Sequence, residues 1–343
     1  MGVRALVTGG CGFIGSHVVR ALLTRGWEVT NLDALTYAAN PLNLSGVEAQ
    51  TGYTFVEGDI CDTPLVRALV RGADVVLNFA AETHVDRSLL KPASFVHADV
   101  QGVVSLLDAL RGEPGAAFFH MSTDEVFGAL EPPLEADEDQ PFAPTSPYSA
   151  SKAAAELQVR AYSHSYGMPA TVIRACNIYG PNQHVEKFIP LFITRAIAGE
   201  PLPLYGDGRQ QREWLYIDDF VSALLAAIAL PRVDCVRAIH AGSGERVTNL
   251  DVATSICSLT ARPVSLIRPV DDRPGHDRRY ALDSSRMRGL GWRPMVPLLS
   301  GLARTVSWYQ EHPEIWSRAL SGQGFEGYFE EQYRTRLAGA DTL

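Results

Sequence analysis

The sequence predicts an α/β protein in which helices cover both faces of a parallel β-sheet. Through the first half of the chain, short apolar runs alternate with longer segments of helical periodicity. Strands of a parallel sheet are buried on both faces, so they read as continuous apolar runs. Their alternation with helices is typical of a doubly wound sheet. Beyond about residue 180, short strands and helices mix with loops rich in Pro, Gly and charged residues, which indicates a smaller mixed α/β lobe.

The predicted strands follow one another in regular order. The first covers residues 3–8 and leads into an amphipathic helix from about Gly12 to Thr24. Helical periodicity returns at 92–111 and 149–166. The remaining strands are expected at 28–33, 54–59, 74–80, 116–122 and 170–176.

The composition excludes several classes of function. The 343 residues are 46% hydrophobic, so a large core is available. A net charge of −9, without a Lys/Arg cluster, argues against nucleic acid as the main partner. Five scattered cysteines with no CxxC pair predict neither a metal site nor a disulfide framework. The chain shows no signal-peptide pattern and no apolar run of membrane-spanning length, so we expect a cytoplasmic protein outside the membrane.

A glycine-rich turn links the first strand to the first helix. It reads TGGCGFIGS, residues 8–16, with the spacing GxxGxxG and no GK[ST] that would make it a Walker loop. Gly9 permits a tight turn, Gly12 lets the backbone approach a pyrophosphate, and Gly15 lets the helix pack closely on the sheet. The helix N-terminus favours negative charge. A Rossmann-like dinucleotide site is therefore expected here.

Acidic residues end the next two strands. Asp33 lies eighteen residues after Gly15, where a carboxylate accepts the ribose hydroxyls and repels a 2′-phosphate. This position favours NAD over NADP. Asp59, in EGDI, is a candidate for the adenine, although a solvated loop acid explains it equally well.

A tyrosine and a lysine would share one face of a helix formed by the segment at 146–156. Tyr148 and Lys152, in SPYSASKAAAE, stand at i and i+4. A neighbouring ammonium favours the phenolate, so we expect the pKa of Tyr148 to fall toward working pH. Ser122 or Thr123, at the tip of a preceding strand, would supply the hydroxyl that orients a substrate.

Two adjacent acids follow that strand in FFHMSTDEVFG, residues 118–128. Neighbouring carboxyl groups in a partly desolvated site split their titration, so one stays protonated while the other is ionised. Asp124 and Glu125 therefore suit a paired acid and base. Taken alone, an acidic first turn stabilised by the helix dipole explains them as well.

These motifs resemble a known group of enzymes. TGxxGxxG together with YxxxK is typical of the extended short-chain dehydrogenase/reductase superfamily. Almost from end to end, the chain resembles the dTDP-glucose 4,6-dehydratases, which carry TDEVFG-like acids where related epimerases and decarboxylases do not. The matching segments are TGGCGFIGSH, NLDALTYAANPLNL, EGDICD, AAETHVDRS, STDEVFG, SPYSASKA, YGPNQHVEKFIPL, PLPLYGDGRQQREWLY and DRPGHDRRYALD.

The resemblance implies a hydro-lyase reaction of deoxysugar biosynthesis, an internal redox cycle with loss of water. Tyr148 would take the proton of the sugar 4-hydroxyl, which Thr123 holds, while hydride passes from C4 to NAD. Glu125 would remove the C5 proton and Asp124 would protonate the departing 6-hydroxyl. Hydride would then return to C6.

The resemblance also implies the binding residues. NAD would contact Gly9, Gly12, Phe13, Ile14, Gly15, Asp33, Thr36, Asp59, Ile60, Ala80, Ala81, Ser122, Tyr148 and Lys152. The nucleotide sugar would contact Thr83, His84, Thr123, Asn177, Lys187, Tyr205, Arg212, Asn249, Arg273 and His276. Guanidinium groups suit a diphosphate because they bind its oxygens in pairs. For His84, a purely structural role is an equal alternative.

The chain departs from the family pattern at several positions. None of these changes removes a proton-transfer group, but those expected near the cofactor and sugar bear on which sugar nucleotide is bound. The departures are Thr83, Ala98, Asp99, Phe127, Arg174, Ile178 and Phe220.

We expect residues 1–180 to form the NAD-binding Rossmann-like domain with the catalytic residues. Residues 181–343 would form mainly the sugar-nucleotide lobe, with about 212–240 returning to the first domain and a loose tail from about Gly322. A homodimer is expected through a four-helix seam, unless the same apolar faces only cover the sheet. That seam would use Val100, Val103, Leu107, Leu157 and Ala161.

Other functions remain open at this stage. A UDP-sugar 4-epimerase or decarboxylase would not need the acid pair. A 4,6-dehydratase of another sugar nucleotide, an alcohol dehydrogenase that releases NADH, and a non-catalytic NAD-binding scaffold are the remaining alternatives.

Overall fold

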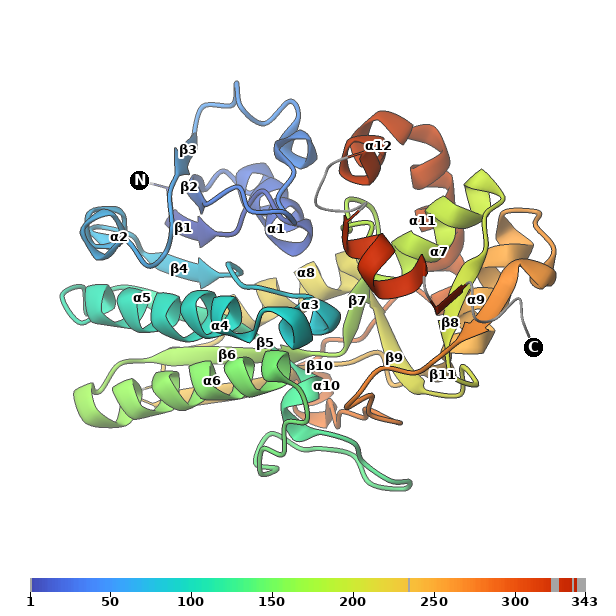
Figure 1. Cartoon of the computed structure of the whole chain (residues 1–343). Coiled ribbons are helices and arrows are strands. Elements are labelled where there is room, and N and C mark those ends of the chain that lie inside the picture. Colours follow the sequence, from blue (N-terminus) through green and yellow to red (C-terminus); the bar gives the residue numbers. More distant parts are fainter. Residues whose placement is uncertain (1, 234, 322–326, 335, 338–343) are drawn as a thin grey trace.

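The protein, described here as a computed structural model, is built on a seven-stranded sheet (Figure 1). The structure describes residues 2–233, 235–321, 327–334 and 336–337. The strand order is β10-β6-β5-β4-β1-β2-β3, and every neighbouring pair is parallel. The strands are β1 (Arg4–Thr8), β2 (Glu28–Asp33), β3 (Tyr53–Glu57), β4 (Val75–Asn78), β5 (Ala117–Thr123), β6 (Ala170–Ala175) and β10 (Val236–Ala241).

Successive residues of each central strand face opposite sides of the sheet, and both sides are apolar. Phe119 belongs to the core under α1 (Phe13–Thr24) and α8 (Ile217–Ile228). Phe118 belongs to the core under the helices of the other face. Those helices are α2 (Thr63–Val70), α5 (Gly102–Leu110) and α6 (Pro147–Tyr166) (Figure 1). This two-sided burial explains the continuous apolar runs and confirms the predicted doubly wound α/β fold.

The helix predicted at 92–111 is not one regular helix. It consists of α4 (Pro92–Phe95), a π-helical turn at Val96–Gln101, and α5. Apolar periodicity does not reveal a π-helical turn, because the residues on either side keep their helical spacing. The turn packs against α6 and carries Asp99, which is 1% exposed.

A smaller lobe stands at the carboxyl end of the sheet (Figure 1). It contains a three-stranded sheet, β11-β9-β7, and a two-stranded sheet, β12-β8. These strands are β7 (Asn177–Tyr179), β8 (Leu202–Tyr205), β9 (Gln211–Tyr216), β11 (Arg246–Thr248) and β12 (Ile267–Val270). The remaining helices are α3 (Val85–Leu90), α7 (Phe188–Ala198), α9 (Asn249–Leu259), α10 (Ser285–Gly289), α11 (Leu298–Glu311) and α12 (Pro313–Ser321).

Part of the predicted loose tail packs firmly. Tyr328 and Tyr333 are each 4% exposed and lie against the smaller lobe. The expectation of loose packing is therefore wrong for these residues, because the aromatic rings bury apolar area. Residues 322–326, 335 and 338–343, also part of that prediction, lie outside the described residues. In the ranges that the structure covers, no helix combines the length and the hydropathy needed to cross a membrane.

Candidate active site

One continuous cavity runs from the carboxyl ends of the sheet strands into the smaller lobe. It encloses about 2310 Å³, including its open mouth. Every residue predicted from the sequence to contact the cofactor or the substrate, or to take part in the chemistry, lines this cavity. The crevice outside the carboxyl ends of the strands is where ligands bind in open α/β sheets. The structure therefore brings together candidates that are up to 267 positions apart, from Gly9 to His276.

The cofactor end is built by glycines that no other residue can replace without movement. Gly9 has a φ of +71°, and a Cβ there would lie 2.7 Å from the Ala80 nitrogen. A Cβ on Gly15 would lie 2.2 Å from the Gly9 carbonyl oxygen. The turn thus needs these glycines for its tight path and for the close approach of α1 to the sheet.

The start of α1 and the end of β2 fit a dinucleotide. Gly12 precedes α1 without a side-chain cap, so the first-turn N–H groups of Phe13 and Ile14 are available to an anion. Asp33 is 6% exposed, and its carboxylate accepts hydrogen bonds from the Cys11 and Leu35 amides at 2.8 and 2.9 Å. These bonds fix the carboxylate at the strand end and leave it lone pairs for ribose hydroxyls.

Replacement of Asp33 by asparagine is expected to weaken NAD binding by about 10- to 100-fold. A charged hydrogen-bond acceptor contributes roughly 1.5–3 kcal/mol, and an amide keeps only part of it. Calorimetric titration with NAD measures this change. Glu57→Gln, at the exposed end of neighbouring β3, is the matched control and should bind like the wild type. Equal affinity of the Asp33→Asn variant and the wild type would contradict the assignment.

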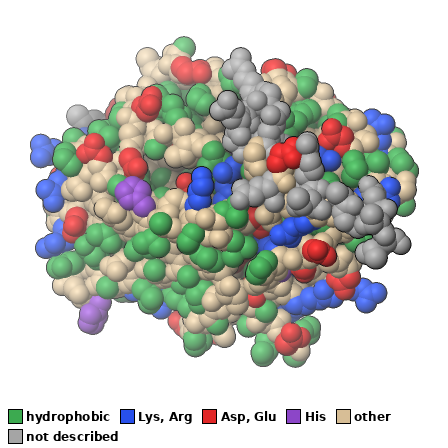
Figure 2. Space-filling model, in the orientation of Figure 1, with side chains coloured by type: hydrophobic (Ala, Val, Ile, Leu, Met, Phe, Trp, Pro, Cys, Tyr) green, Lys and Arg blue, Asp and Glu red, His purple; other side chains and the backbone are tan. Residues whose placement is uncertain are grey.

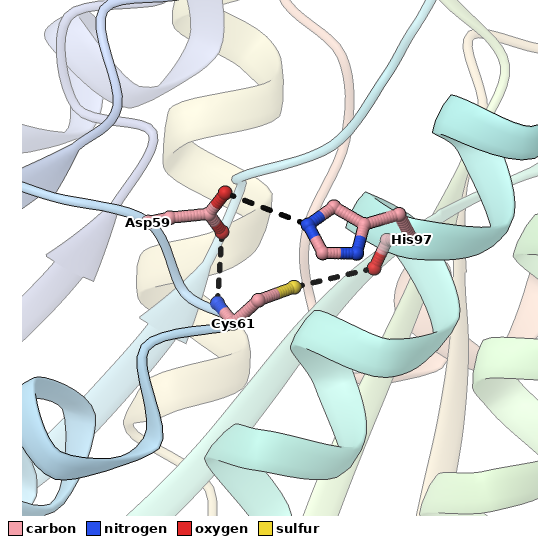
Figure 3. Close-up of side chains that lie close together, drawn as sticks. All are labelled: Asp59, Cys61 and His97. Carbon is pink, nitrogen blue, oxygen red and sulfur yellow. Dashed lines mark hydrogen bonds and ion pairs between the residues drawn. The ribbon is translucent and has the colours of Figure 1, made fainter.

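Asp59 lies at the rim of the same end, beside Cys61 and His97 (Figure 3). Its carboxylate accepts a hydrogen bond from the Cys61 amide at 2.8 Å and lies 3.7 Å from Nε2 of His97. The Cys61 thiol donates to the His97 carbonyl at 3.4 Å. Burial and the charge of Asp59 raise the pKa of this thiol to about 12, which opposes the thiolate that a metal ion requires. We assign no metal to the cluster, and contact of Asp59 with adenine stays a prediction.

The acid pair occupies a 3₁₀ turn at Asp124–Phe127, directly after β5. Thr123 caps the turn: its hydroxyl accepts from the Glu125 amide at 3.3 Å and donates to the Asp124 carboxylate at 3.1 Å. Asp124 is 3% exposed, and its second oxygen has no partner among the described residues. Both acids line the cavity. The strand end therefore presents two acids to a ligand rather than to solvent.

The two acids differ in their surroundings. Burial, and then the charge of Glu125, raise the pKa of Asp124 well above its usual value. Burial also raises the pKa of Glu125, but this rise is opposed by Arg273, Arg212 and Lys187. The surroundings therefore favour a shared proton on Asp124 more than on Glu125, which lies nearer the cationic side chains. This arrangement gives one acid and one base side by side.

The expected fall in the pKa of Tyr148 is wrong for the protein alone. Burial and the charges of Glu125 and Asp99 raise the pKa of the phenol well above its usual value, and the hydrogen bond with Thr123 opposes them only in part. The Lys152 ammonium donates to the Met121 carbonyl at 2.7 Å. The i, i+4 spacing is present, but carboxylates and burial outweigh the lysine at the phenol.

The structure separates the two hydroxyls at the strand tip. Ser122 donates its proton to Glu156 at 2.5 Å, although it lines the cofactor end of the cavity. Thr123 is therefore the hydroxyl candidate for a substrate. Glu156 also pairs with Arg174 at 2.8 Å, and both side chains are fully buried. The departure at Arg174 thus lies behind the strand tip and not in the cavity wall.

Asp86 lies in the part of the cavity where the sequence predicts the nucleotide, here called the nucleotide end. This residue was not among those predicted from the sequence. Its carboxylate pairs with Arg273 at 2.7 Å and accepts from the Tyr205 hydroxyl at 2.9 Å. Burial alone would raise the pKa of Asp86, but the nearby cationic groups, Arg273 foremost, outweigh it and hold this pKa below its usual value. Asp86 thus orients a guanidinium and an aromatic ring toward the cavity.

Several polar atoms in this end have no partner among the described residues. They include the amide oxygens of Asn177 and Asn249 and the Nε of Arg273. All three residues line the cavity, as does Arg212, which is held by the Gln211 and Asp277 carbonyls at 2.8 and 2.9 Å. Buried polar groups normally find partners, so these atoms indicate a site for a polar ligand. The amide oxygens would accept its hydrogen bonds, and the arginines suit negative charge.

The remaining predicted residues of this end are engaged with the protein. His84 hydrogen-bonds the Glu186 carbonyl at 2.9 Å and packs against Tyr328, which favours the structural alternative for this histidine. Lys187 donates to the Thr83 carbonyl, and burial lowers its pKa to about 8. His276 hydrogen-bonds Asp272 at 2.6 Å. Lys187 and His276 still line the cavity, so their substrate contacts stay predictions.

Two further tyrosines line the cavity and were not predicted from the sequence. Tyr280 donates to Glu125 at 3.4 Å and to Asp277 at 2.9 Å. Tyr333 comes from the C-terminal segment and lies 5.7 Å from the Tyr205 ring, centroid to centroid. Tyr280 belongs to DRPGHDRRYALD, one of the segments that resemble the dehydratases. Nothing in the local sequence distinguishes this tyrosine from a core residue.

Comparison with known proteins agrees with this geometry. Residues 5–242 match the model of the NAD dependent epimerase/dehydratase family. A dTDP-glucose 4,6-dehydratase of Xanthomonas campestris is 43% identical, covering 98% of each chain, and one of Streptomyces griseus is 46% identical, covering 92% of this chain and 97% of the relative. The crystal structure of DesIV, a dTDP-glucose 4,6-dehydratase from Streptomyces venezuelae with NAD and TYD bound, covers 92% of this chain and 100% of its own. It is 43% identical, with a TM-score of 0.88. The resemblance seen in the sequence is thereby confirmed, and the chain belongs to the NAD dependent epimerase/dehydratase family.

Proposed function

We propose that this protein is an NAD-dependent hydro-lyase that converts dTDP-glucose to dTDP-4-keto-6-deoxyglucose. The observation that carries the proposal is the pair of adjacent acids, Asp124 and Glu125, which lines one cavity with Tyr148 and in which the surroundings favour the proton on Asp124. The dehydratase relatives at 42–46% identity support the same substrate. The partnerless polar atoms and the arginines of the nucleotide end suit its diphosphate and base.

The proton transfers follow from the positions of the side chains. Tyr148, hydrogen-bonded to Thr123, accepts the proton of the sugar 4-hydroxyl. NAD, which the glycine turn and Asp33 would hold, would supply a hydride acceptor for C4 and donor for C6, and its positive ring would favour the phenolate. The 4-ketone acidifies the C5 hydrogen, which Glu125 removes. Asp124 protonates the 6-hydroxyl so that it leaves as water, and Glu125 returns its proton to C5.

The proposal predicts a reaction without net redox change. Incubation with dTDP-glucose should give the alkaline chromophore of a 4-keto product while free NADH does not accumulate. UDP-glucose and GDP-mannose in parallel reactions test the nucleotide and the sugar. Stoichiometric NADH release, or a product epimerised at C4 that keeps its 6-hydroxyl, would contradict the proposed function.

We further propose that the protein is a homodimer, through faces that differ in part from those predicted. Val103 and Leu107 are 0% and 1% exposed, so they cover the sheet and cannot form a seam. Val96 and Leu157 are 57% and 55% exposed, and Ala161 is also exposed. Figure 2 shows apolar side chains gathered over this side of the molecule. The exposed faces of the π-helical turn and of α6 therefore support a four-helix contact between two copies.

Leu157→Glu is expected to convert the dimer into monomers, because it places a charge at the centre of the apolar seam. Light scattering after size exclusion measures the mass. Leu299→Glu, at a residue of α11 that is 61% exposed, is the control and should remain dimeric. A monomeric wild type, or a dimeric Leu157→Glu variant, would contradict the seam.

We also propose a cytoplasmic location. The five cysteines are free, which suits a reducing compartment. The proposed substrate is a nucleotide sugar, a class of metabolite that is made inside the cell.

A further inference from the structure

Asp99 is a buried acid beside the proposed catalytic helix. It lies in the π-helical turn Val96–Gln101, is 1% exposed, and its carboxylate accepts two hydrogen bonds. One comes from the Glu82 amide at 2.9 Å and the other from the Ser151 hydroxyl at 2.6 Å. π-helical turns inside longer helices are frequent at functional sites. Here the turn joins the loop after β4 to the first turns of α6.

Asp99 forms no ion pair with any residue that the structure describes. The same holds for Lys152, which follows Ser151 and whose ammonium is bound by the Met121 carbonyl at 2.7 Å. The buried carboxylate is thus hydrogen-bonded to Ser151, and the buried ammonium of the next residue to Met121, without an ion pair between them. Buried charges are costly unless compensated. Burial raises the pKa of Asp99 to about 6, and Lys152 opposes this rise.

The influence of Asp99 reaches both proposed catalytic groups. Burial lowers the pKa of Lys152, and the charge of Asp99 raises it more than any other group does. Asp99 also raises the pKa of Tyr148, after burial and Glu125. Three other titratable groups face this region: Glu156, whose charge also raises the pKa of Lys152, Glu82, whose pKa rises by burial and by the charge of Asp99, and His120, whose pKa burial lowers.

We propose that Asp99 is a positioning residue for the proposed dehydratase reaction. Its carboxylate sets the electrostatic potential at Lys152 and Tyr148, and it thereby determines the pH range in which the sugar 4-hydroxyl loses its proton. The catalytic consequence of this inference rests on the proposed function. The effect of the Asp99 charge on the titration of Lys152 can be tested without substrate.

The test uses the small number of lysines. The chain contains only Lys91, Lys152 and Lys187, so carbon-13 labelling of the lysine ε-carbons gives three resonances to follow against pH. In Asp99→Asn, the titration of Lys152 is expected to move to lower pH by about one unit, since a negative charge near the ammonium is removed. Lys91 is exposed and serves as the internal control, which should not move. An unchanged Lys152 titration would overturn the proposal.

Steady-state rates then test the catalytic consequence. Tyr148 acts as a base only when its phenol is ionised, and Lys152 assists it only when protonated. Loss of the Asp99 charge should lower the pKa values of both residues, which bound the kcat profile. The profile of Asp99→Asn should therefore shift to lower pH by about one unit. Ser151→Ala removes a hydrogen bond that lowers the pKa of Asp99, but the carboxylate stays ionised well above that pKa, so the variant should retain the wild-type alkaline limb.

The outcomes separate the two proposals. A uniform loss of kcat in both variants, with unchanged limbs, would make Asp99 merely structural. If Lys152 shifts as expected but the wild type does not convert dTDP-glucose, the electrostatic role stands and the proposed function fails. If the wild type is active and Lys152 does not shift, only the role of Asp99 fails.

Discussion

Glu125→Gln is expected to stop water loss while C4 oxidation continues, with kcat for the 6-deoxy product reduced by about 10²- to 10⁴-fold. An amide keeps the size of the side chain and its hydrogen bond from Tyr280. It cannot take the C5 proton. Tyr148 and Thr123, to which we assign the first step, are unchanged.

The change can be followed in a single turnover. Absorbance at 340 nm should rise in the variant and persist, whereas the wild type should show only a brief rise. In D₂O, the C5 hydrogen should exchange with solvent in Asp124→Asn but not in Glu125→Gln, because only the former retains the base. Formation of 6-deoxy product by Glu125→Gln at the wild-type rate would contradict the assignment, as would C5 exchange in that variant.

Glu156→Leu is expected to destabilise the protein by about 3–5 kcal/mol, the usual cost of leaving one partner of a buried ion pair uncompensated. Arg174 makes three hydrogen bonds to the Glu156 carboxylate, at 2.8–3.0 Å, and both side chains are fully buried. Nη1 of Arg174 also donates to the Glu138 carbonyl at 3.0 Å. Without Glu156, the guanidinium charge would remain in the interior with neutral acceptors only.

Urea denaturation of the wild type and the variant measures this cost. The double variant Glu156→Leu with Arg174→Met is the control, since it replaces both charges by apolar groups and should recover most of the lost stability. The single variant should also lose activity, because Ser122, at the strand tip before Asp124, loses its acceptor. A free energy of unfolding within 1 kcal/mol of the wild type would show that the pair does not act as described.

The strands and their ends could be predicted because a strand that is buried on both faces appears in the sequence as a continuous apolar run. β2 coincides with the predicted range, and β5 extends to Thr123, one residue beyond it. The residues at the strand ends were likewise predictable, since the carboxyl ends of parallel strands meet at one edge of the sheet. Local motifs therefore placed Asp33 and the acid pair in a single cavity.

What the sequence could not show depends on contacts between distant segments. Spacing places Lys152 beside Tyr148, but it does not reveal that burial and carboxylates dominate the pKa of the phenol. Helical periodicity marks Val103 as apolar without telling whether it faces the sheet or a second copy. Asp86 meets Tyr328 across 242 positions, and no local pattern predicts such a pairing.

The most direct measurement follows a deuterium atom from C4 of dTDP-glucose. The account predicts that dTDP-[4-²H]glucose in ordinary water gives a 4-keto product carrying deuterium in the new methyl group at C6, with no free reduced cofactor. This result requires oxidation, loss of water and hydride return within one cavity. Appearance of the label in released NADH, or a product that keeps its 6-hydroxyl, would contradict the internal redox cycle.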